Sequence, residues 1–140
     1  MTAQIIEIEP DRNQALKGQG TPEQVLDSIV HGINTGNLDA LMALYEPEAA
    51  FAAQPGNLAH GLPGVHASLA AFIGMQGTLD LTVTRVLEAS DLALVAGEWS
   101  FTGAGPDGEP VKLTGRNADV LRRQSDGSWR FVIDNPWGTD

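Results

Sequence analysis

The chain has 140 residues, a net charge of -10 and no cysteine. This length fits one domain with a buried core. The acidic balance disfavours nucleic acid as a partner, because basic side chains supply most of the affinity for a phosphate backbone. The lack of cysteine excludes disulfides and thiol nucleophiles. No apolar run reaches the roughly 18 residues of a membrane helix, and the first residues lack a signal-peptide pattern, so we expect a cytoplasmic protein without a membrane partner.

The first 20 residues show little hydrophobic periodicity. We expect residues 1–20 to form a flexible arm, followed by a single domain over residues 21–138. That domain opens on a helix-start signal, in which Thr21 is the N-cap, proline follows it, and Gln24 completes a capping box. Apolar residues at helical spacing continue the pattern to Ile33.

Two further helices and then a run of strands are predicted. Asn37 caps a short helix that continues through Tyr45, and a third helix opens at Pro63 and ends near Gly74. A loop is expected from Gln54 to Gly61. From Thr78 onward the pattern changes to strands, and turn signals near residues 90, 107 and 126 divide it into a four-stranded meander. Helices followed by a meander predict an α+β domain.

The last turn, Asp126-Gly127, is typical of a two-residue hairpin loop. Counting outward from this loop places Asp119 directly opposite Asp134. Two facing carboxylates repel each other unless they share a proton or a cation bridges them. We therefore predict that these two residues, the acid pair, mark the functional site.

The same counting from two-residue loops assigns the other strand residues to the two faces of the sheet. One face is predicted to line a cavity through Arg85, Glu98, Asn117, Asp119 and Asp134. The opposite face is predicted to contact a second copy of the chain through Trp99, Arg116, Phe131, Ile133 and Trp137. Both faces are largely apolar, which favours a homodimer that covers the second one. Alternatively, the aromatic face packs on the helices and the acid pair is solvated.

Three sequence motifs carry a resemblance to a known family. They are Gly36-Asn37-Leu38-Asp39-Ala40-Leu41 with the Leu44–Ala49 run that follows, the Gly61-x-x-Gly64-Val65 helix start, and the run Gly127–Val132. Together they resemble the nuclear transport factor 2-like superfamily, which includes ketosteroid isomerase and the SnoaL-like cyclases, over roughly residues 21–138. The ending Asp134–Gly138 is similar to that of uncharacterised bacterial SnoaL-like proteins. The resemblance implies a cone of helices packed on a curved, mostly antiparallel sheet.

The catalytic residues of ketosteroid isomerase are matched only in part. Its general base falls on Ala53 and its hydrogen-bonding tyrosine on Ile29, whereas its acid on the penultimate strand is matched by Asp119. Alanine cannot abstract a proton, and isoleucine cannot stabilise an enolate. The resemblance therefore leaves it open whether the chain is an enzyme, while it implies that Asp119 points into the cone between the sheet and the helices.

Two classes of function follow from these observations. An enzyme would act without a cofactor on an apolar, oxygenated small molecule, with the acid pair as catalytic acid and base in an isomerisation, cyclisation or hydration. A non-catalytic domain would bind a ligand or form a dimer, with Arg85 neutralising the acid pair in a clamp for an anion or polar group. His60 and His66 would then lie at the cavity mouth and contact the ligand, and their spacing does not indicate a metal site.

Overall fold

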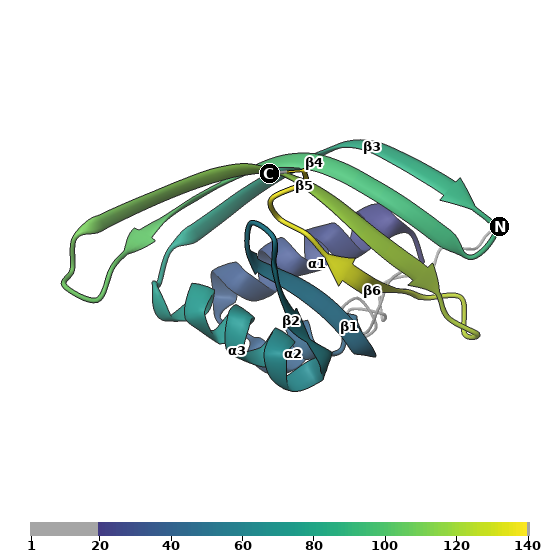
Figure 1. Ribbon diagram of the computed structural model, residues 1–140, viewed down its shortest axis with the longest axis horizontal. Helices are drawn as coiled ribbons and strands as arrows, with labels where there is room; N and C mark the ends of the chain where they lie inside the picture. The colour runs from purple at the N-terminus through teal and green to yellow at the C-terminus, as the bar shows by residue number, and fades with distance from the viewer. Residues whose placement is uncertain (1–19, 140) are drawn as a thin grey trace, which may run out of the picture.

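The computed structural model describes residues 20–139, so the predicted arm lies almost wholly outside the described residues. Three helices lie beneath an arched sheet of six strands (Figure 1). Along the chain the elements are α1 (Pro22–Thr35), α2 (Leu38–Met42), β1 (Tyr45–Gln54), β2 (Asn57–His60), α3 (Gly61–Gly74), β3 (Thr78–Ala89), β4 (Leu92–Ala104), β5 (Pro110–Arg123) and β6 (Trp129–Asp134). The predicted α+β class is confirmed.

The sheet is mixed but mostly antiparallel. Its strand order is β2-β1-β6-β5-β4-β3, and β1 with β6 is the parallel pair. The predicted meander corresponds to β3 through β6. The helices cover the inner face of this sheet, where the buried side chains of β4 and β5 meet those of α1 and α3.

The start of α1 follows the predicted capping box. The Thr21 hydroxyl accepts a hydrogen bond from the Gln24 backbone N–H, and the Gln24 side chain accepts one from the Thr21 N–H, both at 3.2 Å. The helix ends at Thr35 and is capped by Gly36, whose φ of 69° lies in the left-handed region that glycine adopts readily. Its apolar face, which includes Leu26 and Ile29, is buried against the sheet.

The prediction of a helix through Tyr45 is wrong. Helix α2 ends at Met42, and Tyr45 is the first residue of β1. The backbone N–H of Phe131 donates to the carbonyl of Leu44 at 2.8 Å, so pairing with β6 draws this segment into the sheet. The expected loop after Gln54 is likewise a hairpin, because β2 pairs back on β1. Local helix propensity is overridden here by strand pairing.

The register between β5 and β6 contains two departures from the predicted hairpin. Gln124 donates through its backbone to Ser128 at 2.7 Å, so the loop has three residues rather than two. A bulge then leaves Val132 without a cross-strand partner, between the pairs Leu121↔Phe131 and Val120↔Ile133. The two departures cancel, and Asp119 and Asp134 lie at corresponding positions as predicted.

The turn between β4 and β5 is also longer than predicted. Ala104 pairs with Pro110, so Asp119 lies opposite Val95 instead of Ala96. A shift of one residue exchanges the two faces of a strand. The odd-numbered residues of β4, which include Trp99 and Phe101, therefore point to the helices together with Asp119.

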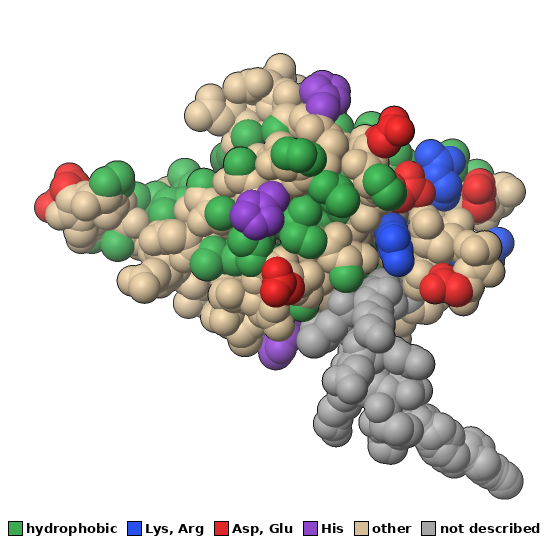
Figure 2. Space-filling model, turned by 90° about the horizontal axis from the view of Figure 1, so that it is seen from below, with side chains coloured by type: hydrophobic (Ala, Val, Ile, Leu, Met, Phe, Trp, Pro, Cys, Tyr) green, Lys and Arg blue, Asp and Glu red, His purple; other side chains and the backbone are tan. Residues whose placement is uncertain are grey.

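Figure 2 shows the surface seen from the side of the helices, where the three histidine side chains are exposed and one of them lies within a patch of apolar side chains. Within the described residues no helix is long and apolar enough to cross a membrane.

Candidate functional site

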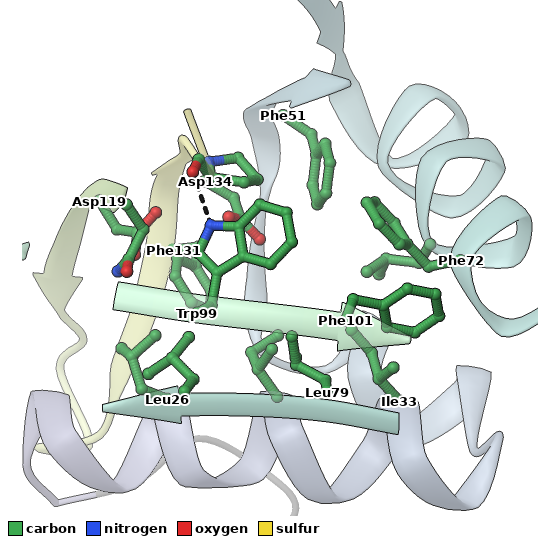
Figure 3. A pocket seen from close by; sticks show the side chains of 15 residues that line it. Leu26, Ile33, Phe51, Phe72, Leu79, Trp99, Phe101, Asp119, Phe131 and Asp134 are labelled. Atoms are coloured by element: carbon green, nitrogen blue, oxygen red, sulfur yellow. Dashed lines mark hydrogen bonds between the residues drawn. The ribbon is translucent and has the colours of Figure 1, made fainter. Parts of the chain in front are cut away.

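A cavity lies between the inner face of the sheet and helices α1 and α3 (Figure 3). Its volume is about 50 Å³. All four phenylalanines of the chain line it, together with Trp99 and several aliphatic side chains. The polar side chains among the described lining residues are Asn117, Asp119 and Asp134. An apolar pocket with a few convergent polar groups is typical of small-molecule sites.

The acid pair sits in a defined network of hydrogen bonds. Oδ1 of Asp119 accepts from the backbone N–H of Asn135 at 2.7 Å, and Oδ2 accepts from the Asn117 side-chain amide at 2.8 Å. Oδ2 of Asp134 accepts from the Tyr45 hydroxyl at 2.5 Å. The two carboxyl groups are close enough for each to shift the pKa of the other.

Burial dominates the electrostatics of this network. Asp119 is 1% exposed and Asp134 is 8% exposed. Burial raises the pKa of Asp134 to about 6, even though the hydrogen bonds from Tyr45 and Asp119 lower it in part. Burial and then the charge of Asp134 hold the pKa of Asp119 well above its usual range. This arrangement favours one proton shared between the two carboxyl groups near neutral pH.

The bulge in β6 explains how two residues three positions apart face the same cavity. Phe131 and Asp134 would point to opposite faces of a regular strand. The extra residue at Val132 changes the alternation, so both side chains line the cavity. On β4, Gly97 leaves room for Asn117, because a Cβ atom at position 97 would lie 2.8 Å from the Asn117 side-chain oxygen.

Two of the residues predicted to line the cavity do not reach it. Arg85 and Glu98 are exposed on the outer face of the sheet. The physical reason is the register of the strands. Because the β4–β5 turn is longer than predicted, Asp119 pairs with the inward-facing Val95 rather than with Ala96. Arg85 does pair with Ala96, so it lies on the outer face. Among the described residues the ion pair is Arg122 with Glu46, and none involves the acid pair. The predicted Arg85 clamp is therefore wrong.

The two predicted ligand-binding histidines also lie outside the cavity lining. His60 occupies the N-cap position of α3, where its side chain makes no capping hydrogen bond, and it is exposed. His66 is exposed on the same helix. The described residues contain no group of three or more histidine, cysteine, aspartate or glutamate side chains placed to hold a metal ion.

The residues predicted for a dimer interface divide between the two faces. Trp99 and Phe131 are buried within the chain and line the cavity, so placing them on the face opposite Asp119 was wrong. Trp137 is half-buried and meets Trp99 edge-on, with ring centres 5.3 Å apart. Arg116 and Ile133 are exposed on the outer face.

Sequence reasoning missed the role of Tyr45 in the site. The ring stacks on Phe131 with centres 4.9 Å apart, and the hydroxyl reaches Asp134. A signal was present, because a residue before proline avoids the helical region and Glu46 precedes Pro47. This restriction favours an extended segment where a helix was predicted.

Comparisons with known proteins agree with this architecture. The model of the SnoaL-like domain family matches residues 26–132. A nuclear transport factor 2-like superfamily protein from Salmonella enterica is similar in structure with a TM-score of 0.72, at 20% identity over 84% of this chain and 87% of the other. A ketosteroid isomerase-like protein from Erwinia carotovora atroseptica has a TM-score of 0.69, at 18% identity over 80% of this chain and 88% of the other. No curated protein matches the sequence.

Proposed function

The chain belongs to the SnoaL-like domain family, and from this premise we propose that its cavity binds an apolar small molecule carrying an oxygen function. We propose further that Asp119 and Asp134 transfer protons to and from that molecule without a cofactor. The name of the ketosteroid isomerase-like neighbour supports a reaction of the isomerase type. Cyclisation and hydration would use the same pair of groups.

One observation carries this proposal: the acid pair is buried at the polar end of a cavity that is otherwise apolar. A general base works best when its pKa lies near the working pH. A pKa of about 6 for Asp134 fits that requirement, and the raised pKa of Asp119 keeps a proton available for donation. Such pairs of buried carboxyl groups are a recurring form of acid–base machinery.

The pair can supply both groups that an enolisation needs. The carboxylate removes a proton from the carbon next to a carbonyl, the electron pair moves to the carbonyl oxygen, and the shared proton is donated to that oxygen. Return of the abstracted proton to a different carbon, while the enol hydroxyl gives its proton back to the pair, completes an isomerisation and restores the starting state. Ala53 and Ile29 carry no titratable group, so the base and the tyrosine of ketosteroid isomerase at these two positions have no equivalent here. Ile29 instead contributes an apolar wall to the cavity.

Deuterium incorporation tests this function without a known substrate. A panel of cyclic and aryl ketones would be incubated with the protein in D2O and followed by proton NMR. We expect exchange next to the carbonyl to exceed the buffer rate for ketones that bind, and to fall at least tenfold in Asp134→Asn, in line with the usual contribution of general acid–base catalysis. Asp80→Asn, at an exposed strand position, is the matched control. Binding without exchange would favour the non-catalytic alternative.

We also propose that the outer face of the sheet forms a homodimer interface. Leu87, Leu94, Val120 and Ile133 follow one another as cross-strand partners over β3, β4, β5 and β6. Leu87 is 54% exposed, Leu94 44% and Ile133 37%, so the row is an apolar stripe that the single chain leaves uncovered. Burial of contiguous apolar surface favours association.

A further inference from the structure

The four carboxyl oxygens of the acid pair differ in the donors that they meet. Both oxygens of Asp119 accept hydrogen bonds from N–H groups, Oδ1 from Asn135 and Oδ2 from Asn117. Oδ2 of Asp134 accepts from the hydroxyl of Tyr45. Among residues 20–139, no group outside the acid pair donates to Oδ1 of Asp134. This atom is therefore the one carboxyl oxygen of the pair that its surroundings leave without a fixed donor.

Oδ1 of Asp134 is also accessible. In the described part of the chain, the side-chain nitrogen and oxygen atoms that are fully buried and lack a partner belong to Asn117, Arg130 and Trp137. Oδ1 of Asp134 is not one of these atoms although it lacks a donor, so part of its surface is open. Asp134 is 8% exposed against 1% for Asp119, and it lines the cavity. A molecule in the cavity can therefore reach Oδ1 of Asp134, whereas both oxygens of Asp119 already face fixed donors.

Tyr45 determines which oxygen of Asp134 stays open. Figure 3 shows Asp119 and Asp134 together at one side of the cavity, across from Phe72. The Tyr45 hydroxyl is bonded to Oδ2, and the residue is 2% exposed, with its ring stacked on Phe131. Tyr45 does not line the cavity, so it contacts the carboxyl group from behind the cavity wall. Because the two oxygens of a carboxyl group point in different directions, holding Oδ2 against Tyr45 leaves Oδ1 for the cavity.

We infer that Oδ1 of Asp134 is the atom that exchanges a proton with the ligand, and that Tyr45 is the positioning residue that holds it in place. When the carboxylate acts as base, the C–H bond next to the carbonyl group of the ligand breaks and an O–H bond forms at Oδ1. The electron pair of the broken bond moves to the carbonyl oxygen, which takes up the proton that the pair shared. Asp119 contributes that shared proton and keeps its hydrogen bonds to Asn135 and Asn117. This inference rests on the proposed function and deepens it, because it gives the two acids unequal roles.

Deuterium exchange of 2-tetralone in D2O, followed by proton NMR, separates the roles of the two acids. We expect Asp134→Asn to exchange at the buffer rate, because an amide does not take up the proton at neutral pH. Asp119→Asn keeps Oδ1 of Asp134 and should exchange at least tenfold faster than Asp134→Asn, in line with the usual contribution of a general base. Equal losses in the two variants, or a larger loss in Asp119→Asn, would overturn the inference and leave the proposed function standing.

Tyr45→Phe tests the positioning role through the pH profile of the same reaction. The titratable groups that act on Asp134 are Tyr45 of β1 and Asp119 of β5. The hydroxyl favours the charged carboxyl group, so its loss should move the rise of the exchange rate to higher pH. At neutral pH the maximal rate should fall severalfold while the KM changes little, because Tyr45 lies outside the cavity lining. A lower rate with an unmoved pH profile would overturn the positioning role.

A crystal structure of the unmodified protein with 2-naphthol keeps the inference testable if the variants fail to fold. 2-Naphthol is a stable enol, and its carbon 1 is the atom that receives a proton when such an enol becomes a ketone. We expect carbon 1 to lie within about 3.5 Å of Oδ1 of Asp134, the spacing of atoms placed to react, and farther from Asp119. A carbon 1 nearer to an oxygen of Asp119 would overturn the inference. If 2-naphthol stayed out of the cavity and no ketone exchanged, the proposed function would fail and the inference with it.

Discussion

Tyr45 and Asp134 are joined by a hydrogen bond of 2.5 Å although 89 positions separate them in the chain. Tyr45 opens β1, and Asp134 is the last residue of the parallel neighbour β6. The tyrosine ring is buried and stacked on Phe131, which leaves its hydroxyl in a fixed direction. The carboxyl group of Asp134 is thereby held by a donor from outside the acid pair.

Replacing Tyr45 by phenylalanine should raise the pKa of Asp134 above its value of about 6. The hydroxyl favours the charged form of the carboxyl group, and its loss leaves burial as the dominant influence. Carbon-13 NMR of the aspartate carboxyl groups across a pH series measures this directly. The stacking on Phe131 is retained, so we expect a loss of only about 1 kcal/mol in the free energy of unfolding. An unchanged or lower pKa would show that the hydroxyl does not stabilise the carboxylate.

The acid pair should make the folded state less stable as the pH rises. A carboxyl group with a raised pKa in the folded state binds its proton more tightly there than in the unfolded chain. Its contribution is therefore complete below the unfolded pKa, near 4, and is lost as the pH passes through the folded value of about 6. For Asp134 a difference of about 2 pKa units corresponds to roughly 3 kcal/mol. The pKa of Asp119 is also raised well above its usual range, so its contribution has the same sign.

Urea unfolding of the wild type and of Asp134→Asn at several pH values isolates this contribution. The variant has a neutral amide at position 134, so it should gain stability relative to the wild type between pH 4 and pH 7. Asp80→Asn, at an exposed position, should show a much smaller change over the same range. A difference between wild type and Asp134→Asn that did not vary with pH would contradict a raised pKa.

That Asp119 and Asp134 face each other could be predicted from the sequence, although the predicted loop length on which this rested was wrong by one residue. The Asp-Gly signal indicated a turn at the right place, and the counting was correct to within one residue. A three-residue loop alone would have moved the two acids out of register. The bulge at Val132 restored it, and such a bulge depends on tertiary packing that no local pattern reveals. The helix start at Thr21 was easier to predict, since its capping box is entirely local.

The assignment of sheet faces failed because it depended on every turn length at once. An Asp-Gly pair at residues 107–108 indicated a two-residue loop, whereas the strands separate at Ala104 and Pro110. That one-residue difference placed Arg85 and Glu98 in the cavity, and Trp99 outside it, in the predicted arrangement. The predicted alternation of side chains along β4 was itself correct, because its odd-numbered and even-numbered residues lie on opposite faces of the sheet. Local patterns define the two sets of side chains but not which set meets the helices.

Gly115→Ala should narrow the cavity from behind Trp99. A Cβ atom at position 115 would lie 2.8 Å from the indole ring of Trp99. Gly115 is paired with Trp99 in the β4–β5 ladder, so the backbone cannot easily move the new methyl group away. The ring must then move, which weakens the 2.7 Å hydrogen bond from its N–H to the Pro136 carbonyl. We expect the affinity for 2-naphthol to fall severalfold, measured by calorimetric titration. Gly105→Ala is the control, because a Cβ atom there finds its nearest neighbour at 3.4 Å. Equal affinities in both variants would show that Trp99 does not shape the binding space.

Leu94→Glu should separate the proposed homodimer without damaging the fold of the chain. Leu94 is the β4 member of the exposed apolar row, between Leu87 and Val120. A carboxylate at this point of an isologous interface would be buried against apolar side chains from the other copy, which is unfavourable. Within a single chain the position is open to solvent, so the thermal midpoint should change little.

Light scattering coupled to size exclusion should give twice the chain mass for the wild type and the single mass for the variant. Ala71→Glu, at an exposed position of α3, introduces the same charge away from the row and should remain dimeric. A monomeric wild type would refute the interface outright, and a dimer that persisted in Leu94→Glu would place the contact on another surface.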